Sequence, residues 1–298
     1  EGIAMCVPGI IDSVQGVCIT GGNLRYVKGL PLATLLEERY GLRVSLENDA
    51  RCAALAELWR GSLKNCADGV VIVLGSAVGG ALVKNGSIHK GSHFSAGEIS
   101  FIEKDGDISD ICNSVGYQNG VLSLYRLVEQ QTGIPAAELD GIRIFEMANR
   151  GDAGVLEAID RFAKSLARVI HNIQAIYDPE VFAVGGAISQ QNLFIEAINI
   201  CSYKIYDCIR INSADNYIGL FKPHIRICHT NVYYSLLLGL LQCCFITLYA
   251  NNLLNAQLTQ RFGIGAANQP QANDSKAELL PPCTSIFATK ISFQKDHS

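Results

Sequence analysis

Hydrophobic positions along this chain follow two periods in turn, and the alternation predicts a mixed α/β fold. Short apolar runs of strand length alternate with longer segments in which apolar residues recur every three or four positions. The pattern predicts strands at residues 2–11, 16–19, 44–46, 70–74, 80–83, 87–89, 181–184 and 225–228, and helices at 32–40, 50–59, 120–132, 142–150, 153–177 and 192–210. Strands that alternate with helices indicate parallel sheets. Residues 2–11 form a short strand broken by Pro8-Gly9, and residues 16–19 are expected to pair back on it as a hairpin. Gly41 is expected to cap the helix 32–40, and Asn85-Gly86 is the predicted turn between strands 80–83 and 87–89.

The chain is long enough for two domains, since it has 298 residues. The polar loop 65–69 precedes a restart of the strand and helix pattern, and we interpret it as a linker between lobes. We therefore expect a first lobe at residues 1–68 and a second at 69–234. An apolar helix that returns to the first lobe is expected at 235–262. The tail at 263–298 is rich in small and polar residues, which predicts disorder.

Composition is typical of a globular protein that acts in the cytoplasm. Apolar residues make up 49% and charged residues 17%, and the net charge is −4 with scattered Lys and Arg, so no nucleic-acid partner is expected. The 11 cysteines are odd in number and irregularly spaced, which favours thiols over a disulfide framework and predicts no structural zinc. The longest apolar stretch, 235–250, is shorter than the ~20 residues of a membrane span. Because the chain begins at Glu1 within a strand, we expect an upstream segment.

Asn48 and Asp49 lie where a predicted strand turns into an alanine-rich helix. Ligands in open α/β sheets gather at the carboxyl ends of strands. A carboxylate at such a position can accept the proton of a hydroxyl group as its oxygen attacks phosphorus. The alternative is that Asn48 or Asp49 only caps the following helix.

A glycine-rich turn follows the apolar strand 70–74. Its Gly75, Ser76, Ala77, Gly79 and Gly80 would let backbone N–H groups and a hydroxyl approach phosphate oxygens. The pattern matches neither the P-loop nor the dinucleotide fingerprint. The turn is therefore either half of a phosphate site or a tight connection between two core strands.

Two further segments offer polar or glycine-rich chemistry. In the loop 91–98, Glu98 can accept hydrogen bonds from two neighbouring sugar hydroxyls, or it is a solvated loop carboxylate. His93 in the same loop is expected to be structural or on the surface rather than a base. Gly185 and Gly186 follow another buried strand, where they border an adenine ring or simply connect the strand to a helix.

The order and wording of these motifs resemble the ROK family of bacterial sugar kinases and sugar-responsive repressors. The resemblance spans residues 2–228 and rests on Val7-Pro8-Gly9-Ile10-Ile11-Asp12, Glu47-Asn48-Asp49-Ala50, Ala56-Glu57, residues 74–80, Asn85-Gly86, residues 91–98 and Gly185-Gly186. It implies an α/β fold of the actin-like, hexokinase type, related to ribonuclease H, with two lobes that close over sugar and Mg·ATP. The first lobe would be the sugar-binding lobe, truncated at its N-terminus, and the second would bind the nucleotide.

The resemblance also implies roles for single residues. Asp49 would be the general base, while Asn48, Glu98 and Asn23 would bind the sugar. Gly75, Ser76, Ala77, Gly79 and Gly80 would meet the phosphates of ATP, and Gly185 and Gly186 would border the adenosine. The implied function is transfer of the γ-phosphoryl group to a hexose or amino-hexose hydroxyl, with Mg²⁺ as cofactor. The alternative is a regulator domain that binds sugar without phosphorylating it, and homodimer formation is left open.

The chain departs from the family pattern at several positions. The Asp-x-Gly-Gly-Thr hairpin that precedes the Pro-Gly segment in the family is absent, so we expect weak or no turnover from these 298 residues. Phe101 stands where the family often has histidine, and Ala77 where glycine is usual. The cysteine-rich zinc motif is reduced to Cys112, again predicting no structural zinc. Residues 236–244 are bulkier than the small-residue helix of the family, which points to an altered reading frame or a divergent extension.

Overall fold

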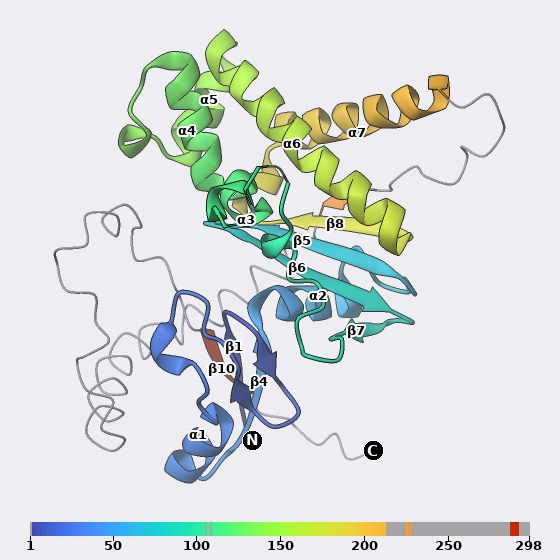
Figure 1. The fold of residues 1–298 in the computed structure, drawn as a ribbon. Helices are drawn as coiled ribbons and strands as arrows, with labels where there is room; N and C mark the ends of the chain where they lie inside the picture. Colours follow the sequence, from blue (N-terminus) through green and yellow to red (C-terminus); the bar gives the residue numbers. More distant parts are fainter. Residues whose placement is uncertain (1, 105, 108, 213–224, 228–286, 292–298) are drawn as a thin grey trace, which may run out of the picture. The chain divides into compact units, whose positions relative to one another are not determined.

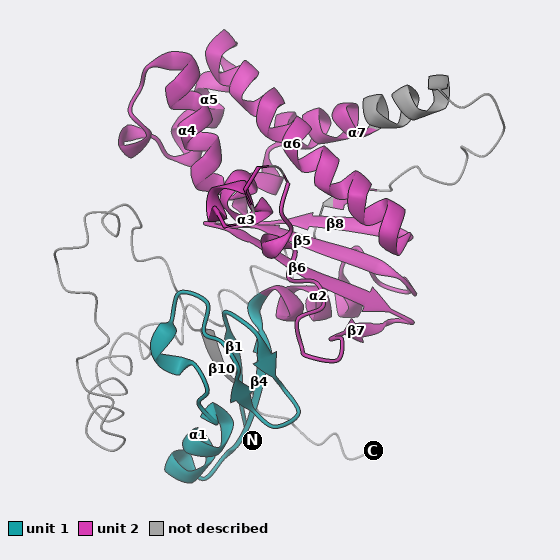
Figure 2. Cartoon of the chain, in the orientation of Figure 1, with its two compact units in different colours: residues 1–49, 234–298 teal, residues 50–233 magenta. Residues whose placement is uncertain are grey.

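The computed structural model of the chain describes residues 2–104, 106–107, 109–212, 225–227 and 287–291. The chain divides into two compact units, the first comprising residues 1–49 and 234–298 and the second residues 50–233 (Figure 2). This boundary falls directly after Asp49, the first residue of the alanine-rich helix, whereas the boundary expected from the sequence follows the helix. The lobe division at residues 68 and 69 stays a prediction, and the apolar helix expected at 235–262 lies outside the described residues.

A three-stranded sheet forms the centre of the first unit. Strand β1 (Gly2–Val7) lies between β4 (Arg43–Asn48), to which it is parallel, and β10 (Phe287–Ile291), to which it is antiparallel (Figure 1). Helix α1 (Leu32–Tyr40) ends at Gly41, whose φ of 64° and bond to the Glu37 carbonyl confirm the predicted C-cap. Strand β10 lies in the tail for which we expected disorder, because the outer edge of β1 offers backbone groups that another strand can pair with.

The predicted hairpin between residues 2–11 and 16–19 is wrong for most of its length. Only β2 (Ile11–Asp12) and β3 (Val17–Cys18) pair with each other. Strand β1 ends at Val7, before the turn at Pro8 and Gly9, and pairs with β4 instead. The break arises because the turn redirects the chain, with Gly9 at a φ of 98° that only glycine adopts readily. The short helix η1 (Arg25–Val27) then leads to α1.

The second unit is built on a five-stranded sheet in the order β7-β6-β5-β8-β9. Three neighbouring strands, β5, β8 and β9, are parallel, β6 pairs antiparallel with β5, and β7 pairs antiparallel with β6. The turn between β6 and β7 has positive φ at Asn85 and Gly86, which confirms the predicted Asn-Gly hairpin. The strands are β5 (Gly69–Leu74), β6 (Val78–Lys84), β7 (Ser87–His89), β8 (Val181–Gly185) and β9 (Ile225–Ile227).

Helices cover both faces of this sheet (Figure 1). The long helices predicted from the apolar period are confirmed, and each begins and ends within two residues of its predicted bounds. Helix α3 and the short 3-10 helices were not predicted. The α-helices are α2 (Asp49–Arg60), α3 (Val115–Asn119), α4 (Val121–Thr132), α5 (Gly141–Asn149), α6 (Ala153–Tyr177) and α7 (Asn192–Asn212). The 3-10 helices are η2 (Ile99–Phe101), η3 (Ile111–Asn113), η4 (Ala136–Glu138) and η5 (Ala187–Gln190). None of the described helices has both the length and the apolar character that crossing a membrane requires.

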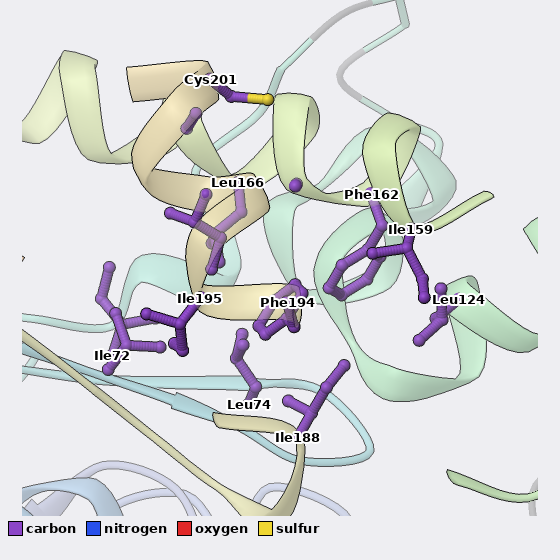
Figure 3. Close-up of a cluster of buried hydrophobic side chains, with 14 of the residues drawn as sticks. Ile72, Leu74, Leu124, Ile159, Phe162, Leu166, Ile188, Phe194, Ile195 and Cys201 are labelled. Carbon is purple, nitrogen blue, oxygen red and sulfur yellow. The ribbon is translucent and has the colours of Figure 1, made fainter. Parts of the chain in front are cut away.

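The main core lies between the sheet and helices α4, α5, α6 and α7 (Figure 3). Ile72 and Leu74 of β5 point into it, and the rings of Phe162 and Phe194 join α6 to α7 with their centroids 5.6 Å apart. A second cluster packs Ala53 and Ala54 of α2 on the opposite face. Because both faces are buried, β5 is a nearly continuous apolar run and its carboxyl end is held firmly.

Candidate active site

Asn48 and Asp49 occupy the carboxyl end of a parallel strand, as predicted. Asn48 is the last residue of β4 and Asp49 is the first residue of α2. Asn48 is only 4% exposed, and its Nδ2 donates a hydrogen bond to the carbonyl oxygen of Gly9 at 3.0 Å. Asp49 is exposed. The buried amide is thus fixed by the backbone, while the carboxylate beside it faces solvent at the helix start.

The loop that accepts this bond is itself rigidly positioned. A Cβ on Gly9 would lie 2.7 Å from both Gly22 N and Thr20 O, so the two loops touch through their backbones. Ile10 N donates to Thr20 Oγ1 at 2.9 Å, and Thr20 N donates to Ile10 O at 3.1 Å. Asn23 follows in the same turn and is exposed. The first unit therefore gathers three predicted features at one place: the strand end, the Pro-Gly loop and the turn that carries Asn23.

The two predicted glycine turns follow the carboxyl ends of neighbouring strands in the five-stranded sheet. Val73 of β5 pairs with Gly185 of the parallel strand β8, so residues 75–77 and Gly186 follow neighbouring strand ends. Gly186 has a φ of 99°, and an added Cβ there would overlap the carbonyl oxygen of Leu74. Residues 75–77 are exposed. An exposed turn and a half-buried glycine thus follow neighbouring strand ends, where α/β proteins bind ligands.

A third segment, which the sequence reasoning missed, lies against the first turn. Val121 N, at the start of α4, donates to Gly75 O at 2.8 Å. An added Cβ on Gly120 would overlap the carbonyl oxygen of Ser76. The N-terminus of α4 therefore lies beside the turn 75–77, and helix N-termini favour anions such as phosphate. The available signal was the Asn119-Gly120 pair ahead of a helical apolar run.

A polar cluster, half-buried except for the wholly buried Asn119, lies next to Gly120. Lys104 Nζ donates to Asn119 Oδ1 at 3.1 Å and to Ser165 Oγ, and Ser165 Oγ donates to Asn119 Oδ1 at 3.2 Å. Burial, and then the charge of Arg168, lower the pKa of the Lys104 ammonium to about 8. Asn119 is wholly buried and immediately precedes Gly120. The cluster thus fixes the residue from which α4 begins.

Gly79 and Gly80 differ in setting from the rest of the predicted phosphate turn. Both lie in β6, where they pair with Val73 and Ile72, so the turn itself is only residues 75–77. An added Cβ on Gly80 would overlap the carbonyl oxygen of Gly97. Close packing of this strand against the loop 91–98 accounts for glycine there, and a nucleotide contact by Gly79 or Gly80 stays a prediction.

Glu98 ends the loop 91–98 and immediately precedes η2. Its side chain is half-buried, and its backbone N–H donates to Ser95 O at 3.2 Å. His93 is exposed, and Phe101, at the position where the family often has histidine, is 65% exposed. Glu98 belongs to the second unit, whereas Asn48 and Asp49 belong to the first.

Arg51 and Glu57 are charged residues of α2, and both are wholly buried. Glu57 Oε2 accepts bonds from Ser62 N and Ser62 Oγ, each at 2.7 Å, and so stabilises the end of α2. Arg51 donates to the loop that carries Glu98. These partners of both side chains lie outside residues 50–59, so the helical pattern of that segment does not show their burial.

Metal and cysteine chemistry is sparse in the described part of the chain. There, no group of three His, Cys, Asp or Glu side chains is arranged to hold a metal ion. Cys18, Cys66 and Cys201 are buried, and Cys6, Cys52 and Cys112 are half-buried, with no disulfide among these six described residues. Burial raises the pKa of the Cys18 thiol to about 11, which makes it a poor nucleophile.

Comparison with known proteins decides the family. The sequence profile of the ROK family matches residues 1–207, which include the strand end at Asn48, both glycine turns and the loop that carries Glu98. The chain belongs to the ROK family. The resemblance drawn from the motifs is confirmed, and with it the actin-like, hexokinase-type α/β fold.

Individual ROK relatives align with about two thirds to three quarters of this chain. The beta-glucoside kinase of Klebsiella pneumoniae is 30% identical over 224 residues, which are 74% of this chain and 75% of that protein. The N-acetyl-D-glucosamine kinase of Vibrio cholerae is 31% identical over 208 residues, or 65% and 68% of the two chains. A ROK family protein from Streptococcus pneumoniae, solved in complex with sucrose, aligns with a TM-score of 0.65 at 30% identity, over 76% of this chain and 74% of that one.

Proposed function

We propose that this chain is an ATP-dependent sugar kinase that transfers the γ-phosphoryl group to a hydroxyl of a hexose or amino-hexose. The names of its ROK relatives, a beta-glucoside kinase and an N-acetyl-D-glucosamine kinase, support a substrate of this class. The single observation that carries the proposal is the position of Asp49. It is an exposed carboxylate at the carboxyl end of a parallel strand, beside an asparagine that the backbone holds in place.

In this proposal the residues of the first unit activate the sugar. Asp49 accepts the hydroxyl proton as that oxygen attacks phosphorus, and Asn48 hydrogen-bonds a neighbouring hydroxyl while its Nδ2 stays bound to Gly9 O. Asn23 offers a further amide from the adjoining turn. Glu98 of the second unit accepts hydrogen bonds from two adjacent hydroxyls. Orienting one hydroxyl in this way lowers the barrier by converting an encounter into a positioned attack.

The nucleotide is proposed to bind at the carboxyl ends of β5 and β8 in the five-stranded sheet. Backbone N–H groups of residues 75–77, the Ser76 hydroxyl and the N-terminus of α4 suit phosphate oxygens, and Gly185 and Gly186 would border the adenosine. Bound Mg²⁺ supplies neutralisation of phosphate charge in kinases of this chemistry. We propose that it enters with the nucleotide, since Mg²⁺ sites use few protein ligands together with substrate phosphates.

The test is a phosphorylation assay on a panel of sugars. The protein is incubated with Mg·ATP and glucose, cellobiose, N-acetylglucosamine or N-acetylmannosamine, and phosphorylated sugar is measured by mass spectrometry. We expect one class of sugar to be phosphorylated, at the low rate already expected of these 298 residues. Sugar binding by calorimetry without any phosphorylated product would instead favour the alternative of a sugar-sensing regulator domain, and binding of none of the panel would refute both functions.

A further inference from the structure

Arg51 is a buried cation that donates hydrogen bonds to the backbone of the loop 91–98. It lies in the first turn of α2, two residues after Asp49, and it is wholly buried. Its Nη2 donates to Phe94 O at 2.5 Å and to Ala96 O at 3.3 Å. Burying a guanidinium is costly unless its donors are used. The arginine therefore holds the backbone of the loop 91–98 whatever the side chains of that loop are.

The loop needs such support at Phe94. This residue has a φ of 57°, the left-handed region that costs a non-glycine residue about 1 kcal/mol or more. Its carbonyl oxygen is the one that accepts the shorter bond from Arg51. Three residues later, Gly97 has a φ of 88°, and an added Cβ would lie 2.9 Å from Ala81 Cα in β6. The loop is thus fixed by Arg51 on one side and by β6 on the other.

Glu98 is the next residue along this fixed backbone. The turn before it is closed by Ala96 N donating to Lys90 O and by Glu98 N donating to Ser95 O, each at 3.2 Å. Ala96 accepts the second bond from Arg51 and lies two residues before Glu98. A shift of the Ala96 carbonyl therefore moves the backbone from which the Glu98 carboxylate extends.

From these contacts we infer that Arg51 is a positioning residue for sugar recognition, which acts by fixing the backbone that carries Glu98. The inference rests on the proposed function, because it requires Glu98 to bind sugar hydroxyls. One helix then carries both the base, at Asp49, and the side chain that places a sugar-binding carboxylate. Arg51 itself does not touch the sugar, and it contributes through the affinity for sugar rather than through the affinity for nucleotide.

The experiment compares Arg51→Lys with Arg60→Lys, an exposed arginine on the same helix. Lysine keeps the charge but lacks the forked donors. Calorimetry with the sugar that the panel identifies is expected to show a Kd about tenfold higher for Arg51→Lys, with the nucleotide Kd within twofold. The control should match the unaltered protein in both. Equal sugar affinity for Arg51→Lys and the unaltered protein would overturn the inference.

A double variant separates positioning from a general structural role. If Arg51 acts through Glu98, then Arg51→Lys should raise the sugar Kd by less than twofold in a Glu98→Gln background. An equal effect in both backgrounds would contradict the inference. Thermal unfolding of each variant checks that the fold is retained.

Hydrogen exchange tests the loop without any sugar. The amides of Ala96 and Glu98 should exchange faster in Arg51→Lys than in Arg60→Lys. Unchanged exchange would refute the role of Arg51 even if the protein proves to be a kinase. Faster exchange in a protein that binds no sugar would instead leave the contact between Arg51 and the loop intact and refute the proposed function.

Discussion

Replacing Gly120 by alanine would disturb the proposed phosphate site without changing any residue of the turn 75–77. Gly120 has a φ of −68° and a ψ of 157°, a conformation that alanine adopts without strain. The added Cβ would nevertheless overlap the carbonyl oxygen of Ser76, in the turn between β5 and β6. Either that turn or the start of α4 must therefore move.

The size of the effect follows from this contact. To reach an ordinary contact distance, the Ser76 carbonyl must retreat by about 1 Å. The bond from Val121 N to Gly75 O, now 2.8 Å, and any bond from the turn to a phosphate lengthen together. Loss of one hydrogen bond to a charged group corresponds to about 1.5–3 kcal/mol, so the nucleotide Kd should rise roughly 10- to 100-fold.

Calorimetry with a non-hydrolysable ATP analogue measures this change. Gly141→Ala is the matched control, since Gly141 also lies at a helix start and an added Cβ there would find its nearest neighbour, Tyr125 Oη, 4.0 Å away. The control should bind the analogue like the unaltered protein, and the sugar Kd of both variants should stay within twofold. Unchanged nucleotide affinity in a folded Gly120→Ala variant would refute the assignment of residues 75–77 to phosphate.

Two further predictions concern the glycine turn after β8 and the half-buried Lys104. Gly186→Ala should lower the free energy of unfolding by about 3 kcal/mol or more, against about 1 kcal/mol for Gly133→Ala. Both glycines have positive φ, but only at Gly186 would an added Cβ also meet the Leu74 carbonyl. Equal losses in urea unfolding would show that this contact is unimportant. The pKa of Lys104 is about 8 in the folded protein and higher when unfolded, so the unfolded chain binds more protons between about pH 8 and 10 and stability should rise with pH there. Urea titrations should show this rise in the free energy of unfolding for the unaltered protein relative to Lys104→Met. The rise should be less than about 1.4 kcal/mol per pH unit, because the ammonium is only half-buried. A difference between the two proteins that does not vary with pH would contradict the prediction.

Local patterns were sufficient for most of the architecture. The helix at residues 153–177 and the hairpin turn at Asn85-Gly86 were predicted because their signals, an apolar face and a turn that needs positive φ, lie within a few neighbouring residues. The pairing partner of β1 was not predicted. Residues 2–7 have the apolar character of a strand, but the choice of β4 over residues 16–19 depends on where the Pro8-Gly9 turn sends the chain.

Parts of the candidate site were beyond the sequence for a similar reason. The glycines at 75, 79 and 80 look alike in the sequence, yet the first opens an exposed turn and the last is packed against Gly97 in a strand. Arg51 looks like an exposed helix residue because its partners, the carbonyls of Phe94 and Ala96, are more than 40 positions away. Gly120 is identified as a site residue only by the structure, in which the start of α4 lies against the turn 75–77.

The central claim, that Asp49 is the base of a sugar kinase, is tested most directly by separating chemistry from binding in Asp49→Asn. The control is Asp12→Asn, since Asp12 Oδ1 accepts bonds from Val14 N and Gln15 N and an asparagine oxygen can accept the same bonds. The rate of sugar phosphorylation by Asp49→Asn is expected to fall by about 10²–10⁴, with its sugar Kd changed only a few-fold and the control unaffected. Phosphorylation by Asp49→Asn at the rate of the unaltered protein would contradict the claim.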